Sequence, residues 1–149
     1  AFEHPVPLSS QAVEALRAVR WLTGRSPFVF PGARSGLKPI SENAIGYLYN
    51  REGYKGRHVP HGWRSSFSTI MNEQAERELG TDVRLLGDRM IVDLMLAHTP
   101  KGMSASELRY NRAAYMPRRR ELAQRWADMI MEDAIPAGEI IDSPRRKRR

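Results

Sequence analysis

The chain of 149 residues contains no cysteine, which excludes disulfide bridges and thiolate metal sites. No apolar run approaches the roughly 20 residues of a membrane-spanning helix, and the start does not read as a signal peptide. The four histidines show no H-x3-H spacing, so a zinc site has little support. No Ser-His-Asp elbow and no phosphate-binding glycine loop are present. We therefore expect no membrane partner, and the cytoplasm is the default location.

Positive charge is concentrated at the C-terminus. The net charge is +7, and residues 145–149 (RRKRR) supply five of these charges, which leaves +2 for the remainder. The isoelectric point near 10.2 therefore describes mainly this end of the chain. A basic segment of this kind can contact DNA phosphates with release of counterions, or it can be a solvated terminus without function. We expect one domain over residues 1–135 and a basic, disordered tail over residues 136–149.

The spacing of apolar residues predicts a mainly α domain with little β structure. Phe28-Val29-Phe30 is expected to be a short buried strand or an anchored loop, and residues 32–39 a loop. Six helices are expected. The first three run from Ser9 or Ser10 to Gly24, from Ser41 to near Gly53, and from His61 to a fading end between Glu73 and Glu78. The last three run from a cap at Asp88 to His98, from Ala105 through Tyr110, and from Pro117 to an end at Pro136 and Gly138.

The stretch His61-Gly62-Trp63-Arg64 organises the expected site. His61 and Arg64 stand three residues apart at a helix start, so both side chains can face one point in space. A helix N-terminus favours anions, and a guanidinium adds a forked donor for phosphate oxygens. This geometry indicates a phosphate site. The same helix has an apolar stripe that is expected to face the core, with His61 and Arg64 beside it. The stripe consists of Trp63, Phe67, Ile70 and Met71.

The polar candidates along the chain are His61, Arg64, His98 and Tyr110, with Tyr115 in reserve. Positive donors can stabilise charge that develops on phosphate oxygens, and a tyrosine can attack phosphorus, so this set suits chemistry on a phosphodiester. Taken singly, each residue also has an ordinary structural explanation. A histidine near a helix C-terminus gains from the helix dipole, and a half-buried tyrosine needs only a hydrogen-bond partner.

Three short motifs, which follow one another along the chain, resemble motifs of a known family. They are His61-Gly62-Trp63-Arg64, followed by Leu96-Ala97-His98, followed by Tyr110-Asn111-Arg112-Ala113. Together with the opening His4-Pro5-Val6-Pro7-Leu8-Ser9 and the later Trp126-Ala127-Asp128, they resemble the end of phage-type integrases. These enzymes are tyrosine recombinases, and the resemblance is nearest to the branch carried by prophages and genomic islands. It extends in order to about Ile130.

The resemblance implies a role for each candidate. His61 and Arg64 would be the histidine and second arginine of the active-site set, His98 the second histidine, and Tyr110 the nucleophile that takes a DNA 3′-phosphate. It also implies cleavage and rejoining of double-stranded DNA at attachment sites without a metal or nucleotide cofactor. The complete protein, of bacterial or phage origin, would work as a homo-tetramer on DNA and associate with the nucleoid in the cytoplasm.

The sequence also departs from the family pattern. No residue can be assigned to the upstream arginine or to the strand-borne lysine that the family uses as acid. The resemblance therefore implies the C-terminal part of a catalytic domain, inactive by itself. The alternative is a non-catalytic helical module that binds DNA or a recombinase partner, and a metal-dependent nuclease has little support. We expect Trp63 and Trp126 in the core, Arg118-Arg119-Arg120 on a solvated or DNA-facing surface, and Tyr115 packed against the last helix as the rival nucleophile.

Overall fold

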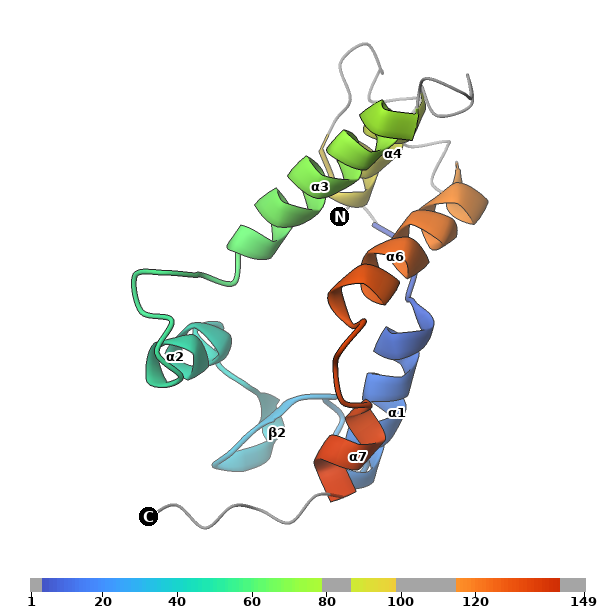
Figure 1. Ribbon diagram of the computed structural model, residues 1–149. Coiled ribbons are helices and arrows are strands. Elements are labelled where there is room, and N and C mark those ends of the chain that lie inside the picture. The colour runs from blue at the N-terminus through green and yellow to red at the C-terminus, as the bar shows by residue number, and fades with distance from the viewer. Residues whose placement is uncertain (1–3, 79–86, 99–114, 143–149) are drawn as a thin grey trace. The chain divides into compact units, whose positions relative to one another are not determined.

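The computed structural model describes residues 4–78, 87–98 and 115–142. As predicted, the described chain is mainly α-helical, with one small antiparallel sheet (Figure 1). It forms two compact units, the first from Ala1–Leu8 and Pro60–Trp126, the second from Ser9–Val59 and Ala127–Arg149. The elements in chain order are α1 (Ser10–Thr23), β1 (Pro31–Gly32), β2 (Ser35–Pro39), α2 (Ala44–Arg51), α3 (Gly62–Glu78), α4 (Asp88–Met95), α6 (Met116–Ile130) and α7 (Ala137–Asp142).

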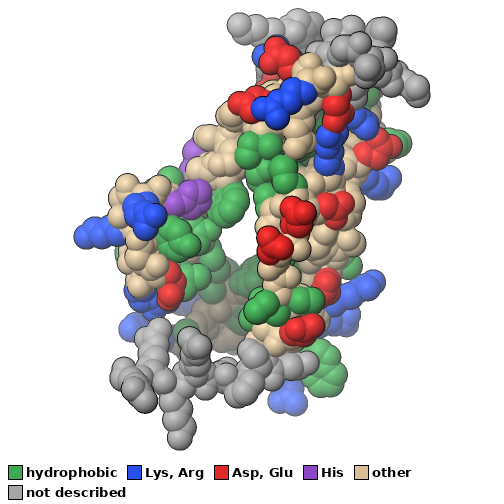
Figure 2. All heavy atoms as spheres, viewed as in Figure 1, with side chains coloured by type: hydrophobic (Ala, Val, Ile, Leu, Met, Phe, Trp, Pro, Cys, Tyr) green, Lys and Arg blue, Asp and Glu red, His purple; other side chains and the backbone are tan. Residues whose placement is uncertain are grey.

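Within the described ranges, no helix has both the length and the apolar character needed to cross a membrane. Figure 2 shows positively and negatively charged side chains on the face in view, with exposed apolar side chains among them. The helix expected over residues 105–110 lies outside the described residues, as does residue 110 itself.

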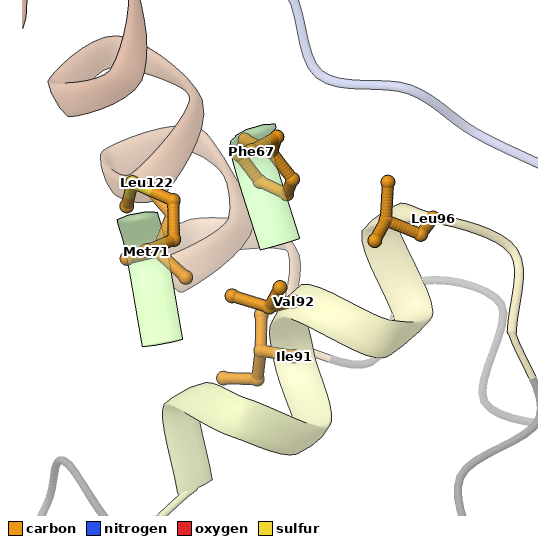
Figure 3. Packing of buried hydrophobic residues seen from close by; sticks show 6 residues of the cluster. All are labelled: Phe67, Met71, Ile91, Val92, Leu96 and Leu122. Atoms are coloured by element: carbon orange, nitrogen blue, oxygen red, sulfur yellow. The ribbon is translucent and has the colours of Figure 1, made fainter. Parts of the chain in front are cut away.

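The core of the first unit lies where α3, α4 and α6 meet. Phe67 and Met71 on α3 are buried as the stripe predicts, and the Phe67 ring meets the Trp126 ring edge to face at 5.4 Å. In Figure 3 the core side chains of α3 and α6 point toward those of α4. Burial of these apolar groups is what holds the three helices together. The buried cluster consists of Phe67, Met71, Ile91, Val92, Leu96 and Leu122.

A buried ion pair joins the start of α4 to α6. Arg118 donates from Nε to Asp88 Oδ1 at 3.0 Å and from Nη2 to Asp88 Oδ2 at 2.7 Å. The Asp88 side chain is only 3% exposed, and it forms no cap hydrogen bond, so the expected capping role is wrong. The hydrogen bond with Asp88, and then that with Glu121, raises the pKa of Arg118 above its ordinary value. This bidentate pair connects the start of α4 to the first turn of α6.

The expectation of a solvated or DNA-facing surface at Arg118-Arg119-Arg120 is wrong for Arg119, which is 4% exposed, with its pKa lowered by burial. Arg118 is partly exposed and engaged with Asp88. A second ion pair lies further along α6, where Arg125 donates to both carboxylate oxygens of Glu78 at the end of α3. The hydrogen bond from Arg125 lowers the pKa of Glu78. These contacts hold α6 against the ends of both neighbouring helices.

The second unit is built on α1. Ser9 caps this helix as expected, since its hydroxyl accepts from the Ala12 backbone N–H at 3.2 Å. α7 packs beside α1 (Figure 1), and Gln11 donates to Asp128 at 2.6 Å. The short strands β1 and β2 pair antiparallel. The predicted apolar face of α1 contains no buried residue, whereas Ala127, at the start of the unit's second segment, is 6% exposed.

α3 ends at Glu78, within the range expected for its end. Three further expectations are corrected by the structure. Residues 31–39 form a hairpin where a loop was expected over residues 32–39, and Phe28-Val29-Phe30 precedes it as exposed, irregular chain, which excludes the buried strand and leaves the loop alternative. Gly138 lies inside α7, whereas α6 already ends at Ile130. Trp63 is 47% exposed and does not belong to the core.

Replacing Met71 by alanine tests the core. Met71 is 2% exposed among α3, α4 and α6, so Met71→Ala is expected to lower the free energy of unfolding by about 2–5 kcal/mol. Met131→Ala is the matched control because Met131 is 37% exposed, and its effect should stay within about 0.5 kcal/mol. Urea denaturation followed by circular dichroism measures both. Equal effects of the two substitutions would contradict the assigned core.

Candidate functional site

The first part of the site is the start of α3. His61 directly precedes this helix, and Arg64 lies in its first turn, where its backbone N–H donates to the His61 carbonyl at 3.0 Å. Both residues are exposed, as a phosphate-binding role requires. The predicted placement of the pair at a helix start is confirmed.

The second part of the site is the end of α4. The His98 N–H donates to the Asp93 carbonyl at 2.9 Å, and the Ala97 N–H donates to the Leu94 carbonyl at 3.1 Å. Ala97 has φ of +56°, in the left-handed region. These two bonds around a left-handed residue form a Schellman motif, which ends a helix by satisfying its last carbonyl groups. The Leu96-Ala97-His98 block is therefore a helix terminator that sets the position of His98.

Arg64 connects the two parts. Its Nη2 donates to the Leu96 carbonyl, and the same atom lies 3.4 Å from His98 Nε2. The His98 side chain is 55% exposed, so the imidazole edge beside the guanidinium reaches solvent. His4 supports the same helix end, since its Nε2 lies 3.2 Å from the Met95 carbonyl. The structure thus brings together Arg64 and His98, which are 34 residues apart in the chain.

The chemistry of this pair favours an anion. A guanidinium carries five N–H donors, and only part of them is used by the Leu96 carbonyl and His98. A protonated imidazole adds another donor on the same side. Among the described residues, no group of three or more carboxylate or histidine side chains could hold a metal ion. The described pair can therefore bind a phosphate oxygen by charge-assisted hydrogen bonds.

The other predicted residues are placed as follows. Within the described ranges, the His61 side chain makes no hydrogen bond to Arg64 or His98. Tyr110 lies outside the described residues. Tyr115 lies in the turn before α6 with φ of +60° and is 46% exposed, so the expectation that it packs against the last helix is not met.

Sequence reasoning missed Asp93. Its Oδ1 lies 3.4 Å from His98 Nδ1, on the side of the ring opposite Arg64. One signal was available in the sequence, because an acidic residue in the last turn of a helix is unfavourable next to the helix dipole. Its spacing of five residues before His98 matches the two contacting positions of a Schellman motif.

Known proteins match the chain over nearly its whole length. It is 44% identical to the prophage integrase IntZ of Escherichia coli (strain K12) over 135 residues, 91% of this chain and 30% of that protein. Identity is 40% with the prophage integrase IntS of the same strain and 39% with the integrase of Shigella phage Sf6, each over 87% of this chain and 30% of the relative. No family model matches the sequence, and no solved structure matches it significantly.

These relatives define the class of protein. The chain belongs to the phage-type integrases of the prophage branch, as the sequence motifs indicated. It spans about 30% of the length of the curated integrases that it matches.

Replacing Ala97 by glycine tests the helix terminator. An alanine in the left-handed region costs about 1 kcal/mol, whereas glycine adopts it freely but loses more chain entropy on folding. Ala97→Gly is therefore expected to be neutral or to raise the free energy of unfolding by up to about 1 kcal/mol. Ala123→Gly, inside α6, should lower it by about 1 kcal/mol. Chemical denaturation measures both, and a loss at Ala97→Gly matching that at Ala123→Gly would rule out the motif.

Proposed function

We propose that the chain is the part of a site-specific DNA recombinase that cleaves and rejoins DNA strands through a 3′-phosphotyrosine intermediate. The observation that supports this proposal is the Arg64–His98 pair at the end of α4, which is open to solvent and has 3.4 Å between Arg64 Nη2 and His98 Nε2. The integrase relatives support DNA as the partner. By the same likeness, the complete protein would act on double-stranded attachment sites as a homo-tetramer in the nucleoid.

In this proposal the scissile phosphate is held by Arg64 and His98. The Tyr110 oxygen attacks phosphorus, a bond forms between them, and the bond from phosphorus to the 5′-oxygen breaks. The tyrosine proton passes to a base in the site, and the 5′-oxygen leaves with a proton from an acid, the role that the family gives to its upstream lysine. Attack by a 5′-hydroxyl on the phosphotyrosine then reverses these steps and rejoins a strand, so no external energy source is needed.

Arg64 and His98 contribute by charge stabilisation. Negative charge accumulates on the non-bridging oxygens as phosphorus becomes five-coordinate, and donors fixed before the reaction stabilise that charge without reorganising. Arg64 is fixed by the Leu96 carbonyl, and His98 by the Schellman backbone bonds. His61, at the start of α3, would assist proton transfer or support the site. Since no residue here is assigned to the family's upstream arginine and lysine, we expect these 149 residues alone not to exchange strands.

A covalent adduct tests the cleavage step. The natural protein that contains this segment would be incubated with a nicked duplex carrying its attachment site and analysed for an SDS-resistant protein–DNA adduct. Tyr110→Phe removes the nucleophilic oxygen and is expected to abolish the adduct. Arg64→Gln should lower its rate of formation by at least 100-fold, because one removed donor to a transition-state oxyanion typically has this effect.

Tyr115→Phe is the matched control and should retain the adduct. Loss of the adduct only in Tyr115→Phe would keep the reaction class and replace the nucleophile. Tight DNA binding without any adduct, in every version, would reject the proposed reaction.

The alternative, a DNA-binding module that does not cleave, is favoured by a different feature of the second unit. A hollow of about 840 Å³ lies beside α1 and the hairpin, lined by both basic and apolar side chains. Trp21 in its wall is 92% exposed. Arginine and exposed tryptophan together suit a phosphate backbone with nearby bases. The charged members of the lining are Arg17, Arg20 and Arg25.

Salt dependence of DNA binding tests this alternative. If the hollow contacts phosphates, Arg17→Gln combined with Arg20→Gln should weaken binding to duplex DNA of any sequence. The slope of log K against log salt should fall by about 1 for each phosphate contact removed. Arg51→Gln, at the end of α2, is the control and should leave the slope unchanged. Unchanged slopes in both variants would exclude the hollow as a DNA-contacting surface.

A further inference from the structure

We propose that Asp93 is a positioning residue that holds the imidazole of His98 in one orientation and one tautomer. Asp93 would keep the proton of the neutral ring on Nδ1, so that Nε2 faces Arg64 and donates to the phosphate once the ring is protonated. The consequence for catalysis rests on the proposed function, whereas the tautomer itself does not.

The geometry of the helix end places the two side chains together. In a Schellman motif the residue after the left-handed position and the third helical residue from the end lie side by side, and they often form an apolar contact. Here these positions are His98 and Asp93, whose backbones are joined by the 2.9 Å bond from the His98 N–H to the Asp93 carbonyl. Their side chains approach to 3.4 Å between Nδ1 and Oδ1. A polar pair thus occupies the place of the usual apolar one.

The chemistry of the two neighbours then selects the tautomer. A guanidinium can only donate hydrogen bonds, and a carboxylate at neutral pH can only accept them. Arg64 Nη2 lies 3.4 Å from Nε2, so Nε2 of a neutral ring must be the acceptor. Asp93 Oδ1 lies beside Nδ1, so Nδ1 must carry the proton. Both contacts select the same form, and a protonated ring would keep the Asp93 contact while Nε2–H turns to a phosphate oxygen.

Helix stability does not account for Asp93. It lies in the last turn of α4, where the free carbonyl groups disfavour a negative charge, and aspartate is a weaker helix former than alanine. Its side chain is 45% exposed and that of His98 is 55% exposed, so their ion pair contributes little to folding. A residue that is locally unfavourable but faces His98 is explained by its effect on the imidazole.

The tautomer can be read directly by NMR. A two-bond ¹H–¹⁵N correlation spectrum of the ¹⁵N-labelled chain, recorded where the histidines are neutral, distinguishes Nδ1–H from Nε2–H. We expect Nδ1–H for His98. His4 is an internal reference of opposite form, because its Nε2 faces the Met95 carbonyl and must donate. His98→Gln assigns the His98 signal.

Variants of Asp93 decide the proposal. In Asp93→Ala, His98 should shift toward the Nε2–H form that a free imidazole prefers, and His4 should be unchanged. Asp93→Glu should restore Nδ1–H, and Asp133→Ala, at an exposed acidic residue, should change neither histidine. The melting temperature of Asp93→Ala should not fall, whereas a purely structural role would lower it. Nδ1–H retained in Asp93→Ala, or Nε2–H in the parent chain, would overturn the proposal.

Activity separates this proposal from the proposed function. In the natural protein, Asp93→Ala is expected to slow adduct formation by on the order of tenfold, with recovery in Asp93→Glu. If no version forms an adduct while the tautomer shifts as described, the recombinase proposal fails and the positioning role stands. If the adduct forms equally fast in Asp93→Ala, the tautomer has no part in the reaction and the catalytic consequence is rejected.

Discussion

Arg64 of α3 donates a hydrogen bond to the Leu96 carbonyl of α4, and the arrangement of the candidate site depends on this contact. The carbonyl is one of the groups that a helix leaves without a partner at its C-terminal end. A hydrogen bond from a charged donor contributes roughly 1.5–3 kcal/mol, which is enough to fix the guanidinium in one orientation. One N–H group of the Arg64 guanidinium thus satisfies the Leu96 carbonyl at the end of α4, while the other N–H groups remain available to a phosphate.

The core makes that contact possible. Leu96 points its side chain into the buried cluster while its carbonyl accepts from Arg64. Phe67 lies one turn after Arg64 on α3 and belongs to the same cluster. α4 is also tied at its start, where Asp88 is paired with Arg118. With both ends and one face held, an eight-residue helix too short to be stable alone can present His98 at a defined place.

Much of this could be predicted from the sequence, because helical periodicity and ordered motifs are local signals. Arg64 and His98 were recognised as partners through the integrase motifs, and the α3 stripe identified Phe67 correctly. Trp63 belongs to the same stripe yet lies beyond the edge of the core, which periodicity alone does not locate. Arg119 is buried despite its charge, a tertiary effect that helical periodicity does not report. The hairpin was missed because Pro31 and Pro39, at its ends, do not favour strands.

The end of α4 combines two choices that are unfavourable for a helix by itself. Ala97 adopts the left-handed conformation that glycine usually supplies, and it shares a positive φ with only one other non-glycine residue in the described ranges, Tyr115. Asp93 places a negative charge at the negative end of the helix dipole. The Ser9 cap of α1, by contrast, follows the local rules. Departures from local preference that converge on one residue, His98, are typical of a functional site, where position is retained at a cost in stability. The chemistry at His98, rather than the folding of α4, therefore accounts best for the sequence Asp93-Leu94-Met95-Leu96-Ala97-His98.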